Sequence, residues 1–153
     1  MYTLDILNRL NDINADKDIK SLSHAVFPGT HCPLFGVILT ASYIKNMALV
    51  VVGTSECTYY AKNFAYHRQE GLDSVYSVAI KESDVVFSAE KKVKKAIKQI
   101  IEFENPDAIM VVSTCVPEVI GEDYSSLSYS LEDEVDIPVF VVNTDHFTCN
   151  AHI

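Results

Sequence analysis

The sequence predicts a single α/β domain with a mostly parallel, Rossmann-like sheet flanked by helices. Three continuous apolar runs, rich in valine and isoleucine, stand at residues 48–53, 108–112 and 139–142. Runs of this length and composition are typical of parallel strands buried on both faces. Helical patterns separate them, and alternation of strand and helix indicates a parallel sheet with crossover helices. At 153 residues the chain has the length of one domain.

The first half of the chain begins with apolar residues at three-residue spacing, which predict a short helix over residues 4–13. We assign this helix to an N-terminal lead-in, residues 1–26, and expect the α/β core to occupy residues 27–153. Proline is favoured at the first helical position, so Pro33 is expected to begin a helix that runs to about Asn46. A strand over residues 47–52, closed by Gly53, and a helix that carries Tyr59, Tyr60 and Phe64 follow.

The second half contains two shorter strand candidates, Ser74–Ile80 and Asp84–Phe87. Residues 90–104 form the clearest helix, because one apolar stripe lies opposite a cluster of lysines. The stripe is Val93, Ala96, Ile97, Ile100 and Ile101, and the lysines are Lys91, Lys92, Lys94, Lys95 and Lys98. We interpret the lysines as a solvated helix face rather than a docking surface. A helix over residues 117–132 and a strand over 138–142 complete the pattern.

Composition narrows the class of protein. The net charge of −9 argues against nucleic acid or an anionic membrane as a partner. The start of the chain has neither the cationic nor the apolar segment of a signal peptide, and no apolar run has transmembrane length. We therefore expect a cytoplasmic protein, in which the four cysteines are buried, catalytic or metal-binding rather than paired in disulfides.

The cysteines stand at informative places. Cys57, Cys115 and Cys149 each follow a predicted strand by a few residues, and ligands of parallel sheets bind beyond the carboxyl ends of the strands. Cys32 instead precedes a helix, where backbone amides are expected to lower the pKa of a thiol. Glu56 should raise the pKa of the neighbouring Cys57. We expect Cys32, Cys57 and Cys115 to share one edge of the domain.

Spacing alone excludes several metal and nucleotide sites. The chain has no C-x-x-C, which excludes a thioredoxin motif and a zinc ribbon, and no closely spaced ferredoxin run. It also lacks G-x-G-x-x-G and the P-loop motif. By this criterion, buried cysteines that act as small hydrophobic residues are as good an interpretation as a metal site.

Three local segments resemble nitrogenase component 1, in the first domain of that superfamily. They are Cys32-Pro33-Leu34-Phe35-Gly36, Gly53-Thr54-Ser55-Glu56-Cys57-Thr58-Tyr59-Tyr60 and Ser113-Thr114-Cys115-Val116-Pro117-Glu118-Val119-Ile120-Gly121-Glu122-Asp123. Residues 84–93 look like the family's segment before its lysine-rich helix, and residues 137–144 like its next strand. The resemblance covers about residue 27 to the end of the chain.

The resemblance implies an iron–sulfur cluster between two subunits, with Cys32, Cys57 and Cys115 as its ligands in this chain. The expected cofactor is a 4Fe-4S cluster completed by one partner ligand, or an 8Fe P-cluster-like group held across a dimer. Cys149 is a candidate fourth ligand, although we prefer an incidental cysteine, and we interpret His31 as a loop histidine. The implied partners are a second copy or a paralogous subunit, and an ATP-dependent iron–sulfur reductase as electron donor.

The function that the resemblance implies is electron relay from that reductase, within a nitrogenase component 1-like oxidoreductase. Family subunits normally carry three such α/β domains, so we do not expect this chain to be catalytically complete alone, and we assign no catalytic residue. Two alternatives are a non-enzymatic scaffold for cluster or cofactor assembly and a cluster-free α/β interaction domain. Glu122 and Asp123, which follow the third motif cysteine, are interpreted as solvated acids.

Overall fold

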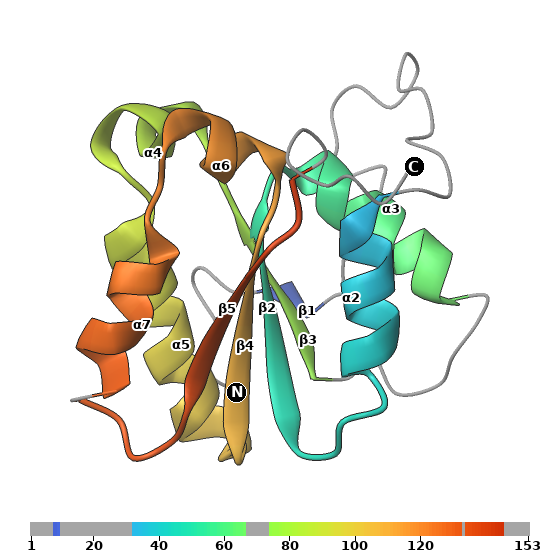
Figure 1. Cartoon of the computed structure of the whole chain (residues 1–153), viewed down its shortest axis with the longest axis vertical. Coiled ribbons are helices and arrows are strands. Elements are labelled where there is room, and N and C mark those ends of the chain that lie inside the picture. The colour runs from blue at the N-terminus through green and yellow to red at the C-terminus, as the bar shows by residue number, and fades with distance from the viewer. Residues whose placement is uncertain (1–7, 10–31, 67–73, 133, 146–153) are drawn as a thin grey trace.

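The computed structural model describes residues 8–9, 32–66, 74–132 and 134–145. Cys149, His31 and nearly all of the lead-in lie outside the described residues, so the expectations for them stay predictions. Within the described part, the chain forms the α/β fold that the sequence predicts, with the elements arranged around one sheet (Figure 1).

Among the described residues, the sheet has five strands in the order β1-β3-β2-β4-β5. The four longer strands are β2 (Met47–Gly53), β3 (Val75–Ala79), β4 (Ala108–Ser113) and β5 (Val139–Asn143), and neighbours among them are parallel. The two-residue β1 (Asn8–Arg9) pairs antiparallel with β3. All seven residues of the central β2 are buried, as the continuous apolar run predicts for a strand covered on both faces.

Helices cover both faces of the sheet (Figure 1). On one face lie α2 (Pro33–Ala41) and α3 (Ser55–Tyr66), and on the other lie α5 (Glu90–Glu104) and α7 (Tyr124–Glu132). Side chains alternate along β2, so that Leu49 and Val51 pack in the core under α2 and α3, whereas Val50 and Val52 pack in the core under α5 and α7. Two short helices, α4 (Glu82–Phe87) and α6 (Cys115–Ile120), lie at the end of the sheet where the parallel strands end.

The long helix α5 has the bounds that the sequence predicts, and Val93, Ala96, Ile97 and Ile100 of its apolar stripe are buried. Its lysine face is only partly solvated. Lys94 and Lys98 both contact the carboxylate of Glu134, and these hydrogen bonds lower the pKa of Glu134 to about 2. These lysines therefore tie α5 to the segment that follows α7.

The predicted helix over residues 4–13 is wrong at the two residues that the structure describes. Asn8 and Arg9 form β1, in register with Ser77 and Tyr76 of β3. The three-residue spacing of apolar residues is compatible with a helix, but the outer edge of β3 offers unpaired backbone groups. Hydrogen bonds to that edge are a tertiary contribution that a local pattern does not contain.

The strand predicted at Asp84–Phe87 is also wrong, because these residues belong to the helix α4. The Asp84 carboxylate accepts a hydrogen bond from the Lys81 backbone N–H at 2.8 Å, which caps the first turn. None of the residues of α4 is buried, and Val86 and Phe87 are 72% and 82% exposed. The Val-Val-Phe run therefore reflects an apolar surface rather than a strand.

The single helix predicted over residues 117–132 is divided into α6 and α7. Gly121 ends α6 with a left-handed backbone, φ 77°, and its N–H bonds the Glu118 carbonyl at 3.2 Å. Asp123 then caps α7 by accepting a hydrogen bond from the Ser126 N–H at 3.0 Å. The break turns α6 into a short element that holds only the start of this segment at the edge of the sheet.

Candidate functional site

The three motif cysteines that the structure describes all stand at the beginning of a helix. Cys32 is the N-cap residue of α2, with extended φ and ψ of −71° and 118°, and Pro33 follows at the first helical position. Cys57 is the third residue of α3, and Cys115 is the first residue of α6. These three helices begin at the end of the sheet where β2 and β4 end (Figure 1). The expected common edge is therefore present.

The thiols of these cysteines are free and partly buried. Cys32 and Cys57 pack against the same core cluster, which contains Leu34 and Phe35, each 2% exposed. Tyr60 also packs against this cluster and meets the ring of Tyr59 edge to face at 5.7 Å between centroids. An apolar wall thus covers one side of the thiols.

The thiols influence one another electrostatically. Burial raises the pKa of Cys32, and the thiols of Cys57 and Cys115 raise it further. Burial also raises the pKa of Cys57, to which Cys115 and Glu56 add in the same direction. The effect of Glu56 has the sign that the sequence predicts. These effects show that the three sulfur atoms lie within electrostatic range of one another, so that negative charges on them would repel.

The prediction that the pKa of Cys32 is lowered is wrong. The amides of Leu34 and Phe35 do lower it, as the helix N-terminus implies, but the removal of the thiol from water outweighs them. The cause is tertiary, because the apolar core that buries Cys32 comes from residues distant in the sequence. The thiols of Cys32 and Cys57 are therefore protonated at neutral pH unless a cation binds them.

A threonine precedes each of the two cysteines that follow strands. Thr54 Oγ1 accepts a hydrogen bond from the Cys57 N–H at 3.4 Å. Thr114 is only 2% exposed, and its hydroxyl lies near enough to the Cys57 thiol to lower the pKa of that thiol, although no hydrogen bond joins the two groups. Both threonines lie where the chain passes from a strand into a helix, Thr54 between β2 and α3 and Thr114 between β4 and α6.

Gly53 makes room for Thr114. Gly53 and Thr114 lie side by side at the ends of β2 and β4, one step beyond the paired residues Val52 and Ser113. A Cβ atom on Gly53 would lie 2.1 Å from Thr114 Oγ1, closer than any real contact. The absence of a side chain at position 53 therefore allows the Thr114 side chain to lie across the end of β2.

The chemistry of the donor set is compatible with an iron–sulfur cluster. Within the described part of the chain, no three His, Cys, Asp or Glu side chains are placed so that they could together hold one metal ion. In a cluster, by contrast, separate irons take separate thiolates, and soft thiolate donors favour such groups. Three partly buried thiols at one edge, with hydroxyl groups beside Cys57, are compatible with that larger group.

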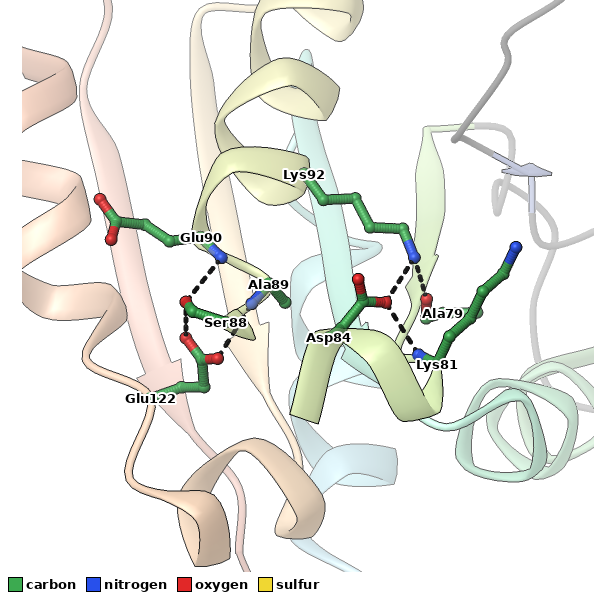
Figure 2. A network of polar contacts seen from close by, with 8 residues as sticks. All are labelled: Ala79, Lys81, Asp84, Ser88, Ala89, Glu90, Lys92 and Glu122. Carbon is green, nitrogen blue, oxygen red and sulfur yellow. Dashed lines mark hydrogen bonds and ion pairs between the residues drawn. The ribbon is translucent and has the colours of Figure 1, made fainter. Parts of the chain in front are cut away.

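A polar network fixes α6 and α4 to the start of α5 (Figure 2). The Glu122 carboxylate accepts hydrogen bonds from Ser88 Oγ and from the Ala89 N–H, both at 2.9 Å. Lys92 in turn donates to the Ala79 carbonyl at 2.6 Å and to Asp84 at 2.9 Å. Glu122 is therefore a structural contact rather than the solvated acid that the sequence analysis expects. It joins the segment after Cys115 to α5.

Comparison with known proteins agrees with this fold. A parallel α/β domain with a thiol-lined edge defines the general class, and the family model of nitrogenase component 1 type oxidoreductases matches residues 32–153. The chain belongs to this family. In the part that the structure describes, no helix is both long and apolar enough to cross a membrane.

Individual relatives include proteins with different roles. The chain is 36% identical over 121 residues to the nitrogenase molybdenum-iron protein alpha chain of Methanosarcina barkeri, covering 74% of this chain and 21% of that protein. It is 29% identical to the nitrogenase iron-molybdenum cofactor biosynthesis protein NifE of the same organism, with coverages of 78% and 26%. The light-independent protochlorophyllide reductase subunit N of Pleurastrum terricola is 29% identical, with coverages of 76% and 26%. The chain thus spans about a fifth to a quarter of the length of these relatives.

A solved structure described as nitrogenase Cp1 at pH 6.5 aligns with a TM-score of 0.65 and 24% identity, over 84% of this chain and 26% of that chain. This similarity supports the fold.

The sequence analysis overlooked the roles of Gly53 and Thr114, although both lie inside the quoted motifs. The only signal for them is their position, because each immediately follows a buried strand and precedes a cysteine-bearing helix. Their contact depends on the parallel pairing of β2 with β4, which are separated by more than fifty residues in the sequence. Asp123, in contrast, could have been identified as a helix cap from its spacing to Ser126.

Proposed function

We propose that this chain is an iron–sulfur cluster-binding domain of a nitrogenase component 1-like oxidoreductase, with Cys32, Cys57 and Cys115 as thiolate ligands. In this proposal residues 27–153 are the cluster-binding core and residues 1–26 the lead-in. The observation that carries it is the arrangement of three helix starts at one sheet edge, where Cys57 and Cys115 raise the pKa of Cys32 and Cys115 raises the pKa of Cys57. Membership of the family supports the same function.

A bound cluster would supply one-electron storage and transfer, and the chain's residues supply the conditions for it. Thiolates that influence one another electrostatically are stabilised by a compensating positive charge, which couples their deprotonation to metal binding. Leu34 and Phe35 close one side of the site to water, and burial is one of the factors that set the potential of such a group. The residues thus favour a retained, partly shielded redox group.

Three ligands leave a cluster incomplete, so the proposal includes a partner. A 4Fe-4S cluster would take one further ligand from a second copy or a paralogous subunit, whereas a symmetric dimer could hold an 8Fe group across its two-fold axis. The electron donor would be an ATP-dependent iron–sulfur reductase. Exposed apolar side chains at the same end of the sheet support an interface there, among them Val86, Phe87 and Val119 at 72%, 82% and 69% exposure.

A scaffold function is the second candidate, and one observation favours it. The relatives include NifE proteins, whose names describe iron-molybdenum cofactor biosynthesis, at 29% identity in Methanosarcina barkeri and 35% in Bradyrhizobium diazoefficiens. A relay should keep its cluster through repeated reduction and oxidation. A scaffold should instead pass the cluster to an acceptor protein, so iron transfer in a mixture with an acceptor distinguishes the two.

The test is the amount of iron and acid-labile sulfide per chain in protein purified without oxygen, with the oligomeric state measured in the same run. About four irons per chain or per dimer would fit a 4Fe-4S group, and about eight per dimer the larger group. Cys32→Ala, Cys57→Ala and Cys115→Ala should each lose iron, and Cys149→Ala serves as the matched cysteine control. Full iron content in any of the first three variants would contradict the ligand assignment.

A further inference from the structure

The buried hydroxyl of Thr114 lies at the edge of the sheet where the cysteine-bearing helices begin. Thr114 is 2% exposed, and its Oγ1 has no hydrogen-bond partner among the described residues. A buried hydroxyl without a partner is destabilising, because it has lost its hydrogen bonds to water. Such a group is therefore expected to have a partner in the functional state of the protein.

The surroundings of Thr114 indicate where that partner lies. Along β4, Val112 faces the core under α2 and α3, whereas Val111 faces the core under α5 and α7. The strand alternation places Thr114 on the same face as Val112, which is also the face against which Cys32 and Cys57 pack. The hydroxyl is thus on the thiol side of the sheet.

Gly53 leaves the space that the Thr114 side chain occupies. Thr114 Oγ1, Cγ2 and Cβ lie 2.1, 2.9 and 3.0 Å from the place that a Cβ on Gly53 would occupy, so the side chain fills that space. Four residues beyond the end of β2, Cys57 stands in the first turn of α3, and its N–H donates a hydrogen bond to Thr54 Oγ1. The Thr114 hydroxyl is close enough to the Cys57 sulfur to influence it as a donor.

We propose that Thr114 is a positioning residue whose hydroxyl donates a hydrogen bond to the Cys57 sulfur when that sulfur is a cluster ligand. This inference rests on the proposed function, because a neutral thiol is a weak acceptor and a metal-bound thiolate is a stronger one. The hydrogen bond would satisfy the buried hydroxyl. It would also favour the reduced, more negative form of the bound group, since hydrogen bonds to cluster sulfurs are among the factors that set its potential.

A pair of substitutions separates the hydroxyl from the shape of the side chain. Thr114→Val keeps the branched shape and removes the donor, whereas Thr114→Ser keeps the donor and removes the methyl group. In the full 153-residue chain, reconstituted without oxygen with iron and sulfide, Thr114→Val should shift the midpoint potential to a more negative value. We expect a shift of roughly tenfold in the reduction equilibrium, about 59 mV for one electron. Thr114→Ser should stay near the wild-type potential.

A second measurement uses the cluster-free chain. If the hydroxyl has no partner there, Thr114→Val should unfold at the same urea concentration as the wild type or at a higher one. If the threonine hydroxyl instead stabilised the cluster-free protein, Thr114→Val would unfold at a lower urea concentration than the wild type.

The outcomes separate this inference from the proposed function. Iron loss in Thr114→Val with retention in Thr114→Ser would support the hydrogen bond, as would the potential shift. Equal potentials in all three proteins would overturn the role of Thr114 and leave the cluster function intact. Equal changes in both variants would also overturn it, because Thr114→Ser retains the hydroxyl and the change would then not depend on that donor. If the wild-type chain takes up no cluster, the proposed function fails together with this inference.

Discussion

The contact between Gly53 and Thr114 predicts that the substitution Gly53→Ala destabilises the folded chain. The added Cβ would lie 2.1 Å from Thr114 Oγ1, 2.9 Å from Cγ2 and 3.0 Å from Cβ. The obstructing side chain is β-branched and 2% exposed, so it has few alternative rotamers and no free space. Overpacking of this kind costs about 1–3 kcal/mol, and we expect Gly53→Ala to lower the free energy of unfolding by about 2 kcal/mol.

Gly36→Ala is a matched control for which we expect the opposite change in the free energy of unfolding. Gly36 is an exposed residue inside α2, and an added Cβ there would meet nothing within 4 Å. Alanine is the better helix former, so this substitution should raise the free energy of unfolding by about 0.5–1 kcal/mol. The same chemical change thus has opposite effects, because only one of the two sites is occupied by a neighbouring side chain.

The assay is urea unfolding of the cluster-free chain followed by circular dichroism. With a dependence on urea of about 1–3 kcal/mol per molar, a loss of about 2 kcal/mol lowers the midpoint by about 1 M. The double variant Gly53→Ala/Thr114→Ala should recover part of this loss, since it removes Oγ1 and Cγ2 but keeps the 3.0 Å contact to Cβ. An unchanged or higher midpoint for Gly53→Ala alone would refute the reasoning.

Three further predictions follow from other parts of the structure. Burial raises the pKa of Asp84, but hydrogen bonds from Lys92 and the Lys81 N–H outweigh this effect, so the pKa lies below its ordinary value. The ionised Asp84 carboxylate therefore stabilises the fold near neutral pH, and this stabilisation is lost as the pH falls through the lowered pKa. Asp84→Asn should therefore cost about 1 kcal/mol at pH 7 and progressively less in acid, and equal losses at pH 7 and pH 2 in guanidinium unfolding would contradict this. Burial raises the pKa of Cys57, so the protonated thiol is favoured in the folded, reduced and iron-free chain. Its contribution to the free energy of unfolding is present below about pH 8.5 and is lost as the pH rises through the raised pKa. Cys57→Ser should flatten the fall in unfolding free energy between pH 7.5 and pH 10, and an identical fall in both proteins would argue against the burial. At Gly121, where φ is 77° and an added Cβ has open space, Gly121→Ala should cost about 1 kcal/mol by thermal unfolding, whereas Gly121→Asn should recover most of it.

Much of the candidate site was predictable from the sequence. The strand-like runs locate the ends of β2 and β4, and chain order alone then puts Cys57 and Cys115 shortly after those ends. Pro33 indicates the helix start that makes Cys32 an N-cap residue. These inferences succeed because they depend on local hydrophobic pattern and on the geometry common to all parallel sheets.

The ionisation of the thiols was not predictable in the same way. The helix start at Cys32 implies a lowered pKa, whereas the fold raises it. The sequence contains the amides that favour a thiolate, but the burial that opposes it comes from a core cluster drawn from α2, α3 and several strands. Desolvation depends on all of these neighbours at once and is therefore a tertiary property.

The sequence by itself determined the fold class, the central strands, the long helix α5 and the placement of three cysteines at one edge. The spacing of apolar residues predicts the strands and the helix, and the order of strands and motifs along the chain predicts the placement of the cysteines. The tertiary structure decided that Val85, Val86 and Phe87 form an exposed helix and that Gly121 breaks the segment after Cys115. It also decided that Thr114 lies in the space left by Gly53, beside Cys57. The reason is that packing and desolvation depend on contacts between residues far apart in the chain, and a local sequence pattern does not specify those contacts.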